Sequence, residues 1–583
     1  MVKELVLTGI KDLWPKPEDE KRCIFLGPWC FTNNPAHQFF EYPQYEIAQT
    51  PWDSLSDIVQ QEKIINKFID KLIPILSNKL DELLDVEMRD AYWRYATSGW
   101  IAHFVAAICD RYSRLKYFDD KRENFSKVKV KILGSLTLSE YEKINLFDLY
   151  HDHYANLILM SDILRHENWK SLNLVETKIE KDNSTKCNTI SWHRKILKSI
   201  YYGSERLIKS QTCLGNVYGL SLWDNIRLAL LIDPFVFLKK RKFIFKKNNI
   251  SSDIRSKLKF DCYENNLEKI VCNLLPKYIP DNLLSVCRYT GNKIKIFFSF
   301  GSLYDIDERH KLAAILASGG KIMGAQHGGI YGQLATSQYS RVEYDTCHQF
   351  INWGWSTHLG YQSSKFINLP SPLISKLVKK YKNRTIKNSC LLYVTSIGET
   401  YFSRFTTSLL PEQKFNYVER KILFIKFLEN HILNKFTYRP YFYDPGNNEI
   451  EFIQNQIGFN LKLLLGGNIY KLMHKYKIII FDHPFTGYLI RLAVNMPMVL
   501  CYDRNHFLMS EEADQDMNEL RKVNVVFDDP KDAAAHINKV HSNIDLWWSS
   551  QQVQDAIKIH VRKYALNSSR WFEDWKNFIR GMI

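Results

Sequence analysis

The spacing of apolar residues changes along the chain, and each change predicts a different kind of element. The segment from Arg22 to Phe31 is a short apolar run broken by a Gly-Pro pair, which predicts a buried strand followed by a turn. From Asp57 to Asp85 apolar residues recur three or four positions apart, which predicts one face of a long helix. A second apolar helix is expected at 92–112 and a strand at 128–133. The stretch 151–247 is mostly helical in pattern, without clear boundaries.

From residue 293 onward strands and helices alternate, which predicts parallel sheets covered on both faces. The predicted strands are 293–299, 321–325, 348–353, 391–395, 436–440, 459–465, 478–481, 498–502 and 524–527. The predicted helices are 308–318, 416–431, 486–494 and 530–540. Because the alternation restarts after Cys390, we expect a second complete Rossmann-like domain there.

A length of 583 residues exceeds what one hydrophobic core supports, so two large domains are expected. We predict an α/β protein with two Rossmann-like domains facing a cleft. Residues 1–385 form the first domain, with helical insertions, and residues 386–550 form the second. Residues 551–583 are expected to be helices that pack back on the first domain.

Charge and cysteine content limit the cellular compartment and the binding partners that we expect for the protein. The formal net charge is +16, concentrated in two basic runs at 239–247 and 376–387, and no nucleic-acid-binding motif accompanies them. Each run is either a solvated loop or a contact to an anionic membrane surface. No window has the roughly 18 apolar residues of a membrane span, and the 11 cysteines show no paired spacing. We therefore expect a cytoplasmic protein, peripheral to the membrane, that does not bind nucleic acid.

The segment 478–503 places a short loop between a buried strand and a helix. Helix N-termini present unpaired N–H groups and a partial positive charge, so such a loop can hold a phosphate. His483 and the stretch from Thr486 through Gly487 to Tyr488 are the candidate phosphate-binding residues. Thr486 is also a candidate helix cap.

A glycine-rich loop, GAQHGGIYG at 324–332, also follows a predicted strand. Gly328 and Gly329 allow close approach of the backbone to a ligand. Gln326 supplies hydrogen-bond donors, and His327 can bind a phosphate or transfer a proton. A histidine in a loop is more often structural, but the glycines around it favour a ligand site.

Several ordered segments together resemble a family of transferases found in gene clusters for bacterial lipopolysaccharide O-antigen and capsule. The matching segments are FLGPWC at 25–30, YWRYATSGW at 92–100, Asp110-Arg111, QHGGIYG at 326–332, NWGW at 352–355, LYVTS at 392–396, TGYLIRLAVNMP at 486–497, the Trp pair at 547–548 and Val553-Gln554. Members of the family commonly have an acidic residue near the position of Ile490 and a small polar residue where Pro484-Phe485 stands. A carboxylate there would bind a ribose hydroxyl, so this chain departs from the family at a nucleotide contact.

The resemblance implies a glycosyltransferase of the two-domain GT-B type. It would transfer a sugar from a nucleotide-sugar donor to a growing surface glycan, free or lipid-linked. The second domain would hold the donor and the first the acceptor. Two alternatives stay open: a transferase of an alcohol phosphate from a CDP-activated donor, and a non-catalytic scaffold of the assembly machinery.

The remaining candidate residues follow from this reading. Arg439, at a strand end, is a candidate for binding the donor phosphate. Gly27 and Trp29, in the first strand-end loop, are candidates for the acceptor site, with Trp29 stacking on a sugar. Asp152 is, with His327, a candidate catalytic residue. No DxD metal motif stands out, so we expect helix N-terminal amides, His327, Arg439 and His483 to stabilise the leaving phosphate without a metal or other cofactor.

Overall fold

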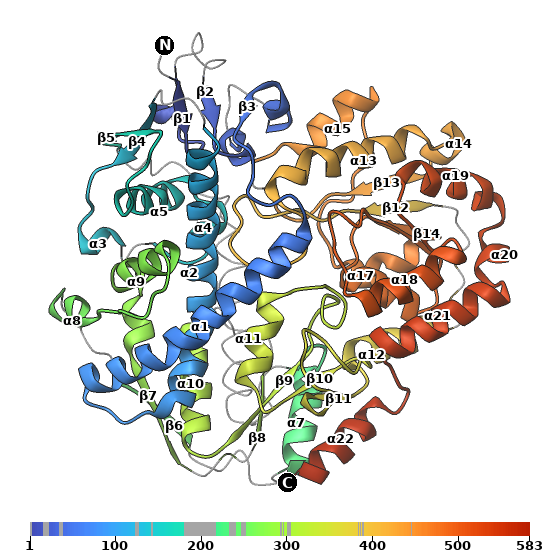
Figure 1. Ribbon diagram of the computed structural model, residues 1–583. Coiled ribbons are helices and arrows are strands. Elements are labelled where there is room, and N and C mark those ends of the chain that lie inside the picture. Colours follow the sequence, from blue (N-terminus) through green and yellow to red (C-terminus); the bar gives the residue numbers. More distant parts are fainter. Residues whose placement is uncertain are drawn as a thin grey trace, which may run out of the picture.

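Three parallel sheets form the framework of the protein in a computed structural model (Figure 1). The structure describes residues 3–15, 23–33, 39–122, 127–141, 144–179, 217–232, 241–246, 252–291, 294, 296–299, 305–382, 384, 386, 390–444 and 446–582. We call the sheets the first sheet (β3-β2-β1-β4-β5), the middle sheet (β11-β10-β9-β8) and the last sheet (β13-β12-β14-β15-β16). The first and last sheets have the strand orders of Rossmann-like folds, which confirms the predicted fold class.

The first sheet and two long helices build the N-terminal part. Its strands are β1 (Glu4–Val6), β2 (Cys23–Phe25), β3 (Glu46–Ile47), β4 (Val128–Leu133) and β5 (Leu172–Thr177), and its helices include α1 (Leu55–Leu84), α2 (Arg89–Asp120), α4 (Asp148–His151) and α5 (His153–Arg165). The elements predicted at 22–31, 57–85, 92–112 and 128–133 are all present. Of the stretch 151–247, residues 180–216 and 233–240 lie outside the described residues.

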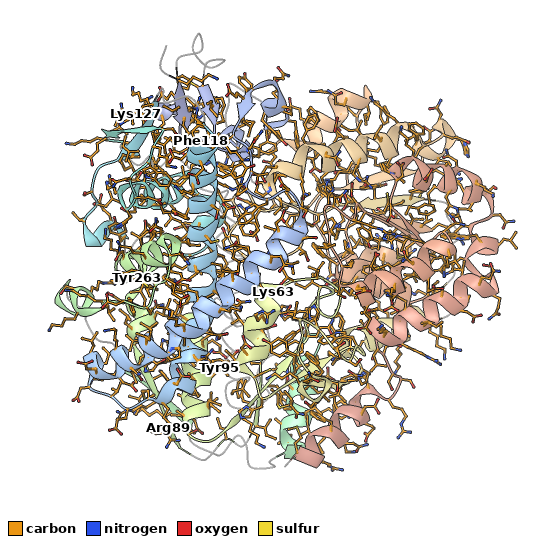
Figure 2. The ribbon with its side chains drawn as sticks, viewed as in Figure 1. Lys63, Arg89, Tyr95, Phe118, Lys127 and Tyr263 are labelled. Atoms are coloured by element: carbon orange, nitrogen blue, oxygen red, sulfur yellow. The ribbon has the colours of Figure 1, made fainter. Side chains whose placement is uncertain are left out.

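Helices α1 and α2 differ in how much of their surface is buried, and their sequences explain why. Helix α1 starts with a capping box of Ser54 and Asp57 and buries one apolar stripe. Helix α2 is apolar or aromatic on nearly every side and is buried along most of its length. Figure 2 shows Tyr95 of α2 among closely packed side chains, and the Arg309 guanidinium lies 4.7 Å from the centre of its ring.

The strands predicted from 293 to 353 form a sheet of their own rather than extending the first sheet. The middle sheet contains β8 (Ile296–Ser299), β9 (Lys321–Ala325), β10 (Gln349–Asn352) and β11 (Phe366–Asn368), with α10 (Ile306–Ala317), α11 (Gln338–Thr346) and α12 (Pro372–Tyr381). Helix α2 packs against α10, α11 and α5, so it lies between this sheet and the first one (Figure 1). The basic run at 376–387 begins inside α12, so the prediction of a solvated loop is wrong for its first part. Of the basic run at 239–247, only residues 241–246 are described, and they form β6 (Arg241–Lys246).

The last sheet is the second Rossmann-like domain that the alternation predicted. Its strands are β12 (Leu391–Val394), β13 (Phe436–Arg439), β14 (Ile478–Phe481), β15 (Met498–Cys501) and β16 (Val526–Phe527), with α13 (Lys414–Lys426), α15 (Glu449–Ile457), α17 (Thr486–Ala493), α18 (Glu511–Lys522) and α19 (Pro530–Val540). The strand predicted at 459–465 is wrong. That segment makes only an isolated bridge from Leu463 to Tyr438, between a left-handed Gly458 and two left-handed glycines at 466 and 467.

The carboxyl ends of the first and last sheets approach each other at His153 and Tyr401. The His153 ring contacts the backbone N–H of Gly9, after β1, and the carbonyl of Thr32, after β2. Its Nδ1 lies 2.6 Å from the Tyr401 hydroxyl, in the loop after β12. The edges at which parallel sheets bind ligands therefore lie on facing sides of one junction.

The C-terminal helices join the last sheet to the middle one. Helix α21 (Gln551–Tyr564) packs on α17 and α18, and α22 (Trp571–Met582) packs on α12 and on α7 (Leu222–Ile232). Trp575 of α22 is buried with Phe298, Met323 and Ile351 of the middle sheet.

Candidate functional site

A pocket lies at the carboxyl edge of the last sheet, beside the loops that follow β12 and β14. These two strands are neighbours in the sheet, and the chain leaves them in opposite directions along it. Such a topological switch point is where open parallel sheets bind ligands. The pocket has a cavity volume of about 80 Å³. Its lining residues are Ser396, Ile397, Gly398, Glu399, Phe402, Arg404, Thr406, Ser408, Leu409, Leu410, Pro411, Tyr417, Phe485 and Phe507.

The two loops that the sequence singled out separately are in contact next to this pocket. The backbone N–H of Gly329 donates to Thr486 Oγ1 at 2.9 Å. A Cβ on Gly329 would lie 2.7 Å from Thr486 N and from the Phe485 carbonyl carbon, so only glycine permits this approach. By contrast, a Cβ on Gly328 would have only Thr486 Oγ1 near it, at 3.6 Å. The glycine-rich loop of the middle sheet therefore closes over the start of α17.

His327 is half-buried in a polar and aromatic setting. Its Nε2 lies 2.6 Å from the Tyr331 hydroxyl and 3.5 Å from Glu343 Oε1. The Tyr331 hydroxyl donates to Glu343. That hydroxyl has one proton, so its oxygen accepts from His327, and Nε2 carries a hydrogen. Burial raises the pKa of Tyr331 well above its ordinary value, and Glu343 adds to the shift, so the phenol stays neutral.

Gln326 does not present its amide to a ligand, contrary to the role expected of it. Its Oε1 accepts from the Trp353 backbone N–H at 3.0 Å and from Trp355 Nε1 at 2.9 Å. Its Nε2 donates to the Gly328 carbonyl at 2.8 Å. The side chain is 2% exposed and holds the loop to the strand end of β10.

His483 is paired with a buried carboxylate at the end of β14. Its Nδ1 lies 2.8 Å from Asp482 Oδ1, and Tyr417 donates to the same oxygen at 2.7 Å. Burial opposes the charge on Asp482, yet Lys421, His483 and Tyr417 together hold its pKa below the ordinary value. The pairing orients the ring, so that Nε2 is the atom with which His483 would meet a ligand.

The first residues of α17 pack against neighbouring side chains as well as forming the start of the helix. Thr486 is the first helical residue, and the cap residue, Phe485, makes no side-chain cap hydrogen bond, so the capping role expected of Thr486 is wrong. A Cβ on Gly487 would meet the Phe481 ring at 2.6 Å. Tyr488 is fully buried, and its hydroxyl bonds to Gln333 and lies 3.2 Å from His560 Nε2. Of these three residues, Tyr488 is buried, whereas Thr486 and Gly487 are half-buried.

Arg439 ends β13 as expected, but its guanidinium is held by backbone. Nη1 donates to the Gly466 carbonyl and Nη2 to the Gly467 carbonyl, both at 2.6 Å. A phosphate would have to compete with these two bonds. Arg439 thus fixes the turn that follows the 459–465 segment.

Trp29 and Gly27 belong to the core, which contradicts the proposed stacking of Trp29 on a sugar. Trp29 is 1% exposed, and its Nε1 donates to the Leu7 carbonyl at 3.0 Å. The Arg114 guanidinium lies 4.9 Å from its ring centre on one side, and Tyr401 packs at 5.1 Å. Its ring also fills the space that a Cβ on Gly27 would occupy.

Asp152 has a structural role that the sequence left open. It is the N-cap of α5, and its Oδ1 accepts from the Ala155 backbone N–H at 2.7 Å. It is half-buried near the junction of the first and last sheets, but it is not among the residues that line the pocket.

Sequence reasoning missed the loop that follows β12, from Ser396 to Pro411, which supplies most of the pocket wall. Glu399 and Arg404 form an ion pair of 2.7 Å there. The signal was present in the chain, since SIGET at 396–400 follows the predicted strand at 391–395 with a glycine at the turn. Without a helix directly after it, this loop did not match the strand-loop-helix pattern.

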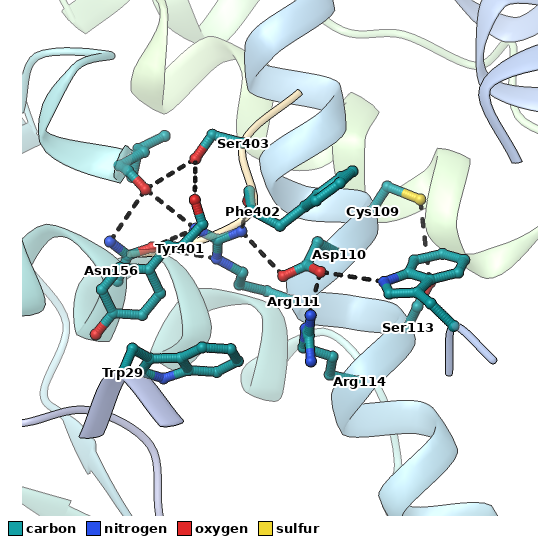
Figure 3. A network of polar contacts seen from close by, with 12 residues as sticks. Trp29, Cys109, Asp110, Arg111, Ser113, Arg114, Asn156, Tyr401, Phe402 and Ser403 are labelled. Carbon is teal, nitrogen blue, oxygen red and sulfur yellow. Dashed lines mark hydrogen bonds and ion pairs between the residues drawn. The ribbon is translucent and has the colours of Figure 1, made fainter. Parts of the chain in front are cut away.

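A buried polar network holds this loop in place (Figure 3). Asp110 of α2 pairs with Arg111 at 3.0 Å and with Arg114 at 2.8 Å. Arg111 also donates to the Phe402 carbonyl, and Arg114 pairs with Glu412. The Asp110-Arg111 segment of the family resemblance thus holds the loop at Phe402, and Arg114, which pairs with Asp110, binds Glu412 just after the loop.

Among the described residues there is no group of three or more His, Cys, Asp or Glu side chains placed to hold a metal ion. In the same part of the chain, no helix combines the length and apolar character needed to cross a bilayer.

Comparison with known proteins gives the family. The model for the LIC12162 family of transferases matches residues 3–579. No curated protein matches the chain. Among solved structures it is similar to MurG of Acinetobacter baumannii, at 12% identity and a TM-score of 0.29 over 50% of this chain and 73% of that one. It is also similar to Alr3699/HepE of Anabaena in complex with UDP-glucose, at 11% identity and a TM-score of 0.31 over 54% and 89%. A third is WaaG, a glycosyltransferase involved in lipopolysaccharide biosynthesis, at 13% identity and a TM-score of 0.24 over 54% and 82%. With almost its whole length matched by the family model, the chain belongs to the LIC12162 family and is a transferase.

Proposed function

We propose that this LIC12162 family transferase is a glycosyltransferase that moves a sugar from a nucleotide-activated donor to a growing bacterial surface glycan of the O-antigen or capsule type. The observation that carries the proposal is the pocket at the switch point of the last sheet, in a transferase with two facing Rossmann-like sheets. Nucleotides bind at such switch points because strand-end loops and helix N-termini converge there.

The start of α17 is the proposed binding place for the donor's phosphates. Its N-terminus has the positive end of the helix dipole. His483, which is oriented by Asp482, comes just before this helix in the chain. His327 belongs to the glycine-rich loop, which contacts Thr486 at the start of the helix. When its ring carries both hydrogens, His483 can donate from Nε2 to a phosphate oxygen, and a protonated His327 ring adds positive charge beside it, which supports their role in stabilising the leaving group.

The acceptor is proposed to enter from the side of the first sheet. This keeps the division into an acceptor part, 1–385, a donor part, 386–550, and C-terminal helices, 551–583. The carboxyl edge of the first sheet meets the loop after β12 through His153 and Tyr401, which supports an approach from that side. A glycan on a lipid carrier would present its reacting hydroxyl in the same way as a free glycan.

We also infer that the protein works at the cytoplasmic face of a membrane, held there by charge. The net charge is +16, and Lys379 and Lys380 at the end of α12 are exposed. A basic residue near an anionic bilayer contributes about 1 kcal/mol to binding. We expect sedimentation with vesicles that contain phosphatidylserine at low salt, less of it at high salt, and less again for a variant with both lysines changed to Glu. Absence of binding at low salt would contradict the inference.

Nucleotide binding and turnover test the function directly. The protein is heated with UDP, GDP, CDP, CMP and dTDP, each at up to millimolar concentration. A ligand at about 100 times its Kd stabilises the folded state by about 2.7 kcal/mol, which raises the melting temperature measurably. Sugars activated by the nucleotide that binds are then assayed for release of that nucleotide. A protein that no nucleotide stabilises and that releases none from any nucleotide sugar is not this enzyme.

A further inference from the structure

The loop after β12 brings one carboxyl group into the pocket at the switch point. Glu399 and Gly398 line it, and Phe485 and Phe507 form another part of the wall. The Glu399 side chain is 21% exposed, so it is accessible to a ligand and yet partly removed from water. The cavity volume of about 80 Å³ is large enough for several water molecules, and therefore for a reacting hydroxyl and the atoms next to it.

Two arginines favour the charged form of this carboxyl group. Arg404 contacts it at 2.7 Å, and the charge of Arg111 acts on it at longer range. Glu399 in turn is one of the carboxylates that favour the charged form of Lys414. Burial nevertheless raises the pKa of Glu399 above that of an ordinary glutamate, against the pull of Arg404 and Arg111. A carboxylate whose pKa is raised in this way is a stronger base than an exposed one.

The backbone on the C-terminal side of Glu399 is fixed to the part of the protein that contains the first sheet. The Tyr401 N–H donates to the Tyr150 carbonyl at 3.1 Å, and the Thr400 hydroxyl lies 3.1 Å from His151 Nδ1. The next residue, Phe402, is held by Arg111 (Figure 3). A general base has to be held to within about half an ångström of its working place, and these contacts provide that support.

We propose that Glu399 is the general base that accepts the proton of the acceptor hydroxyl. This inference rests on the proposed function and names a residue for its chemical step. The acceptor oxygen forms a bond to the anomeric carbon of the donor, and the bond from that carbon to the phosphate oxygen breaks. The electron pair leaves with the nucleoside phosphate, and the proton of the acceptor hydroxyl passes to a carboxylate oxygen of Glu399.

Its position distinguishes Glu399 from the other acidic candidate at the junction. Asp152 is used as the cap of α5, whereas Glu399 lines the pocket between the side from which the acceptor approaches and the proposed donor site. Arg404 then acts as a positioning residue for the carboxylate.

The test compares Glu399→Gln, which keeps shape and removes the base, with Glu399→Asp, which keeps the base on a shorter side chain. Glu419→Gln is the control, because Glu419 is exposed on α13. Each full-length variant is measured for affinity to the nucleotide that stabilises the wild type and for hydrolysis of the matching nucleotide sugar, with water as acceptor. The pH dependence of hydrolysis is recorded for all four proteins.

For Glu399→Gln we expect unchanged nucleotide affinity and hydrolysis that is about 10² to 10⁴ times slower, the usual contribution of a general base. We also expect loss of the fall in rate that the wild type shows as the pH drops and the base is protonated. Glu399→Asp should recover part of the rate, and Glu419→Gln should match the wild type. Wild-type hydrolysis by Glu399→Gln, or an equal loss of nucleotide affinity, would overturn the inference. Wild-type turnover tests the function, and only the ratio of variant to wild type tests Glu399.

Discussion

At the scale of single residues, the main cost in this site is the burial of charge. Asp482 is 3% exposed and Lys421 is fully buried, with Lys421 Nζ 2.9 Å from Glu449 and 3.8 Å from Asp482. Removing one partner from such a group leaves the others charged in a poor solvent. The arrangement is therefore costly to disturb, and it fixes the end of β14 from which the ligand loop starts.

Asp482→Asn should destabilise the protein at pH 7 by about 3 kcal/mol, because it leaves His483 without its carboxylate partner and leaves the buried Lys421 with Glu449 alone. The pKa of Asp482 is lowered by folding, so its stabilisation is present above the ordinary carboxyl pKa of about 3.9 and is lost as the pH falls through the folded value. Urea unfolding of both proteins at several pH values measures this. The difference should be constant from pH 7 to about 5 and should narrow below about 4.

The matched control is Asp545→Asn, whose carboxyl is 75% exposed in its pair with Lys477. An exposed pair contributes less than about 1 kcal/mol. Equal losses in the two variants would mean that burial of Asp482 has no special cost.

His327→Ala should lower turnover about 10² to 10⁴ times, because it removes either a proton-transfer group or a donor to the leaving phosphate. The side chain also contributes to structure, since Nε2 bonds to the Tyr331 hydroxyl, lies 3.5 Å from Glu343, and the ring packs on Tyr339; one such hydrogen bond is worth about 1 kcal/mol. Melting temperature and turnover per folded molecule are measured on one preparation. If the variant keeps wild-type turnover, His327 is a structural residue.

At the scale of elements, the site depends on two loops from different sheets lying against each other. Gly329 should therefore be sensitive to the addition of a single methyl group. In Gly329→Ala the Cβ would press on the backbone at Phe485 and Thr486, which cannot move without shifting the start of α17. We expect a loss of about 1 to 3 kcal/mol in stability and weaker nucleotide binding.

Gly328→Ala is the control, since its Cβ has open space apart from one ordinary contact. Thermal unfolding and nucleotide titration compare the two variants. If both bind nucleotide like the wild type, the contact between the loops is not part of the site.

The elements that could be predicted are those whose own sequence determines them. The strands at 321–325 and 478–481 and the helix at 530–540 have the predicted ends, since apolar runs and turn residues mark both ends. The strand predicted at 459–465 is absent because its β-favouring residues are not all buried in the sheet. Phe459 and Leu465 are 43% and 69% exposed, at the outer side of β13.

The position of the candidate site could be predicted from the sequence, but the contacts of its individual side chains could be predicted less well. The sequence placed each of the loops at 326–329 and 483–487 at a strand end, but it did not show that these loops, from different sheets, are in contact. It did not reveal that Gln326, Arg439 and Trp29 are occupied by contacts within the protein, because their partners lie far away in sequence. Glu399 was missed because no helix directly follows its loop, and because Phe485 and Arg111, which complete its setting, lie far away in sequence.

At the scale of the whole molecule, three sheets are joined by elements that cross between them. Helix α2 lies between the first and middle sheets. Its Arg111 holds the pocket loop of the last sheet at Phe402 (Figure 3), and its Arg114 pairs with Glu412 just after that loop. Helix α22 at the C-terminal end covers a face of the middle sheet that would otherwise expose apolar side chains. Disrupting the contacts of either α2 or α22 should affect the site, even though neither helix lines the pocket.

Trp575→Ala tests the second connection. Trp575 is 2% exposed, its ring packs on Phe298, and its Nε1 donates to the Pro370 carbonyl at 2.9 Å. Truncation of a buried tryptophan costs about 3 to 5 kcal/mol, and the carbonyl is left without its donor. As a control, Leu546→Ala, at a position 69% exposed, should change stability by less than about 0.5 kcal/mol.

Hydrogen exchange localises the effect of Trp575→Ala. If α22 stabilises the middle sheet, amides of β8 and β9 lose protection in this variant, while those of the first sheet keep theirs. Unchanged protection of β8 and β9 would mean that the middle sheet is stable without its cover.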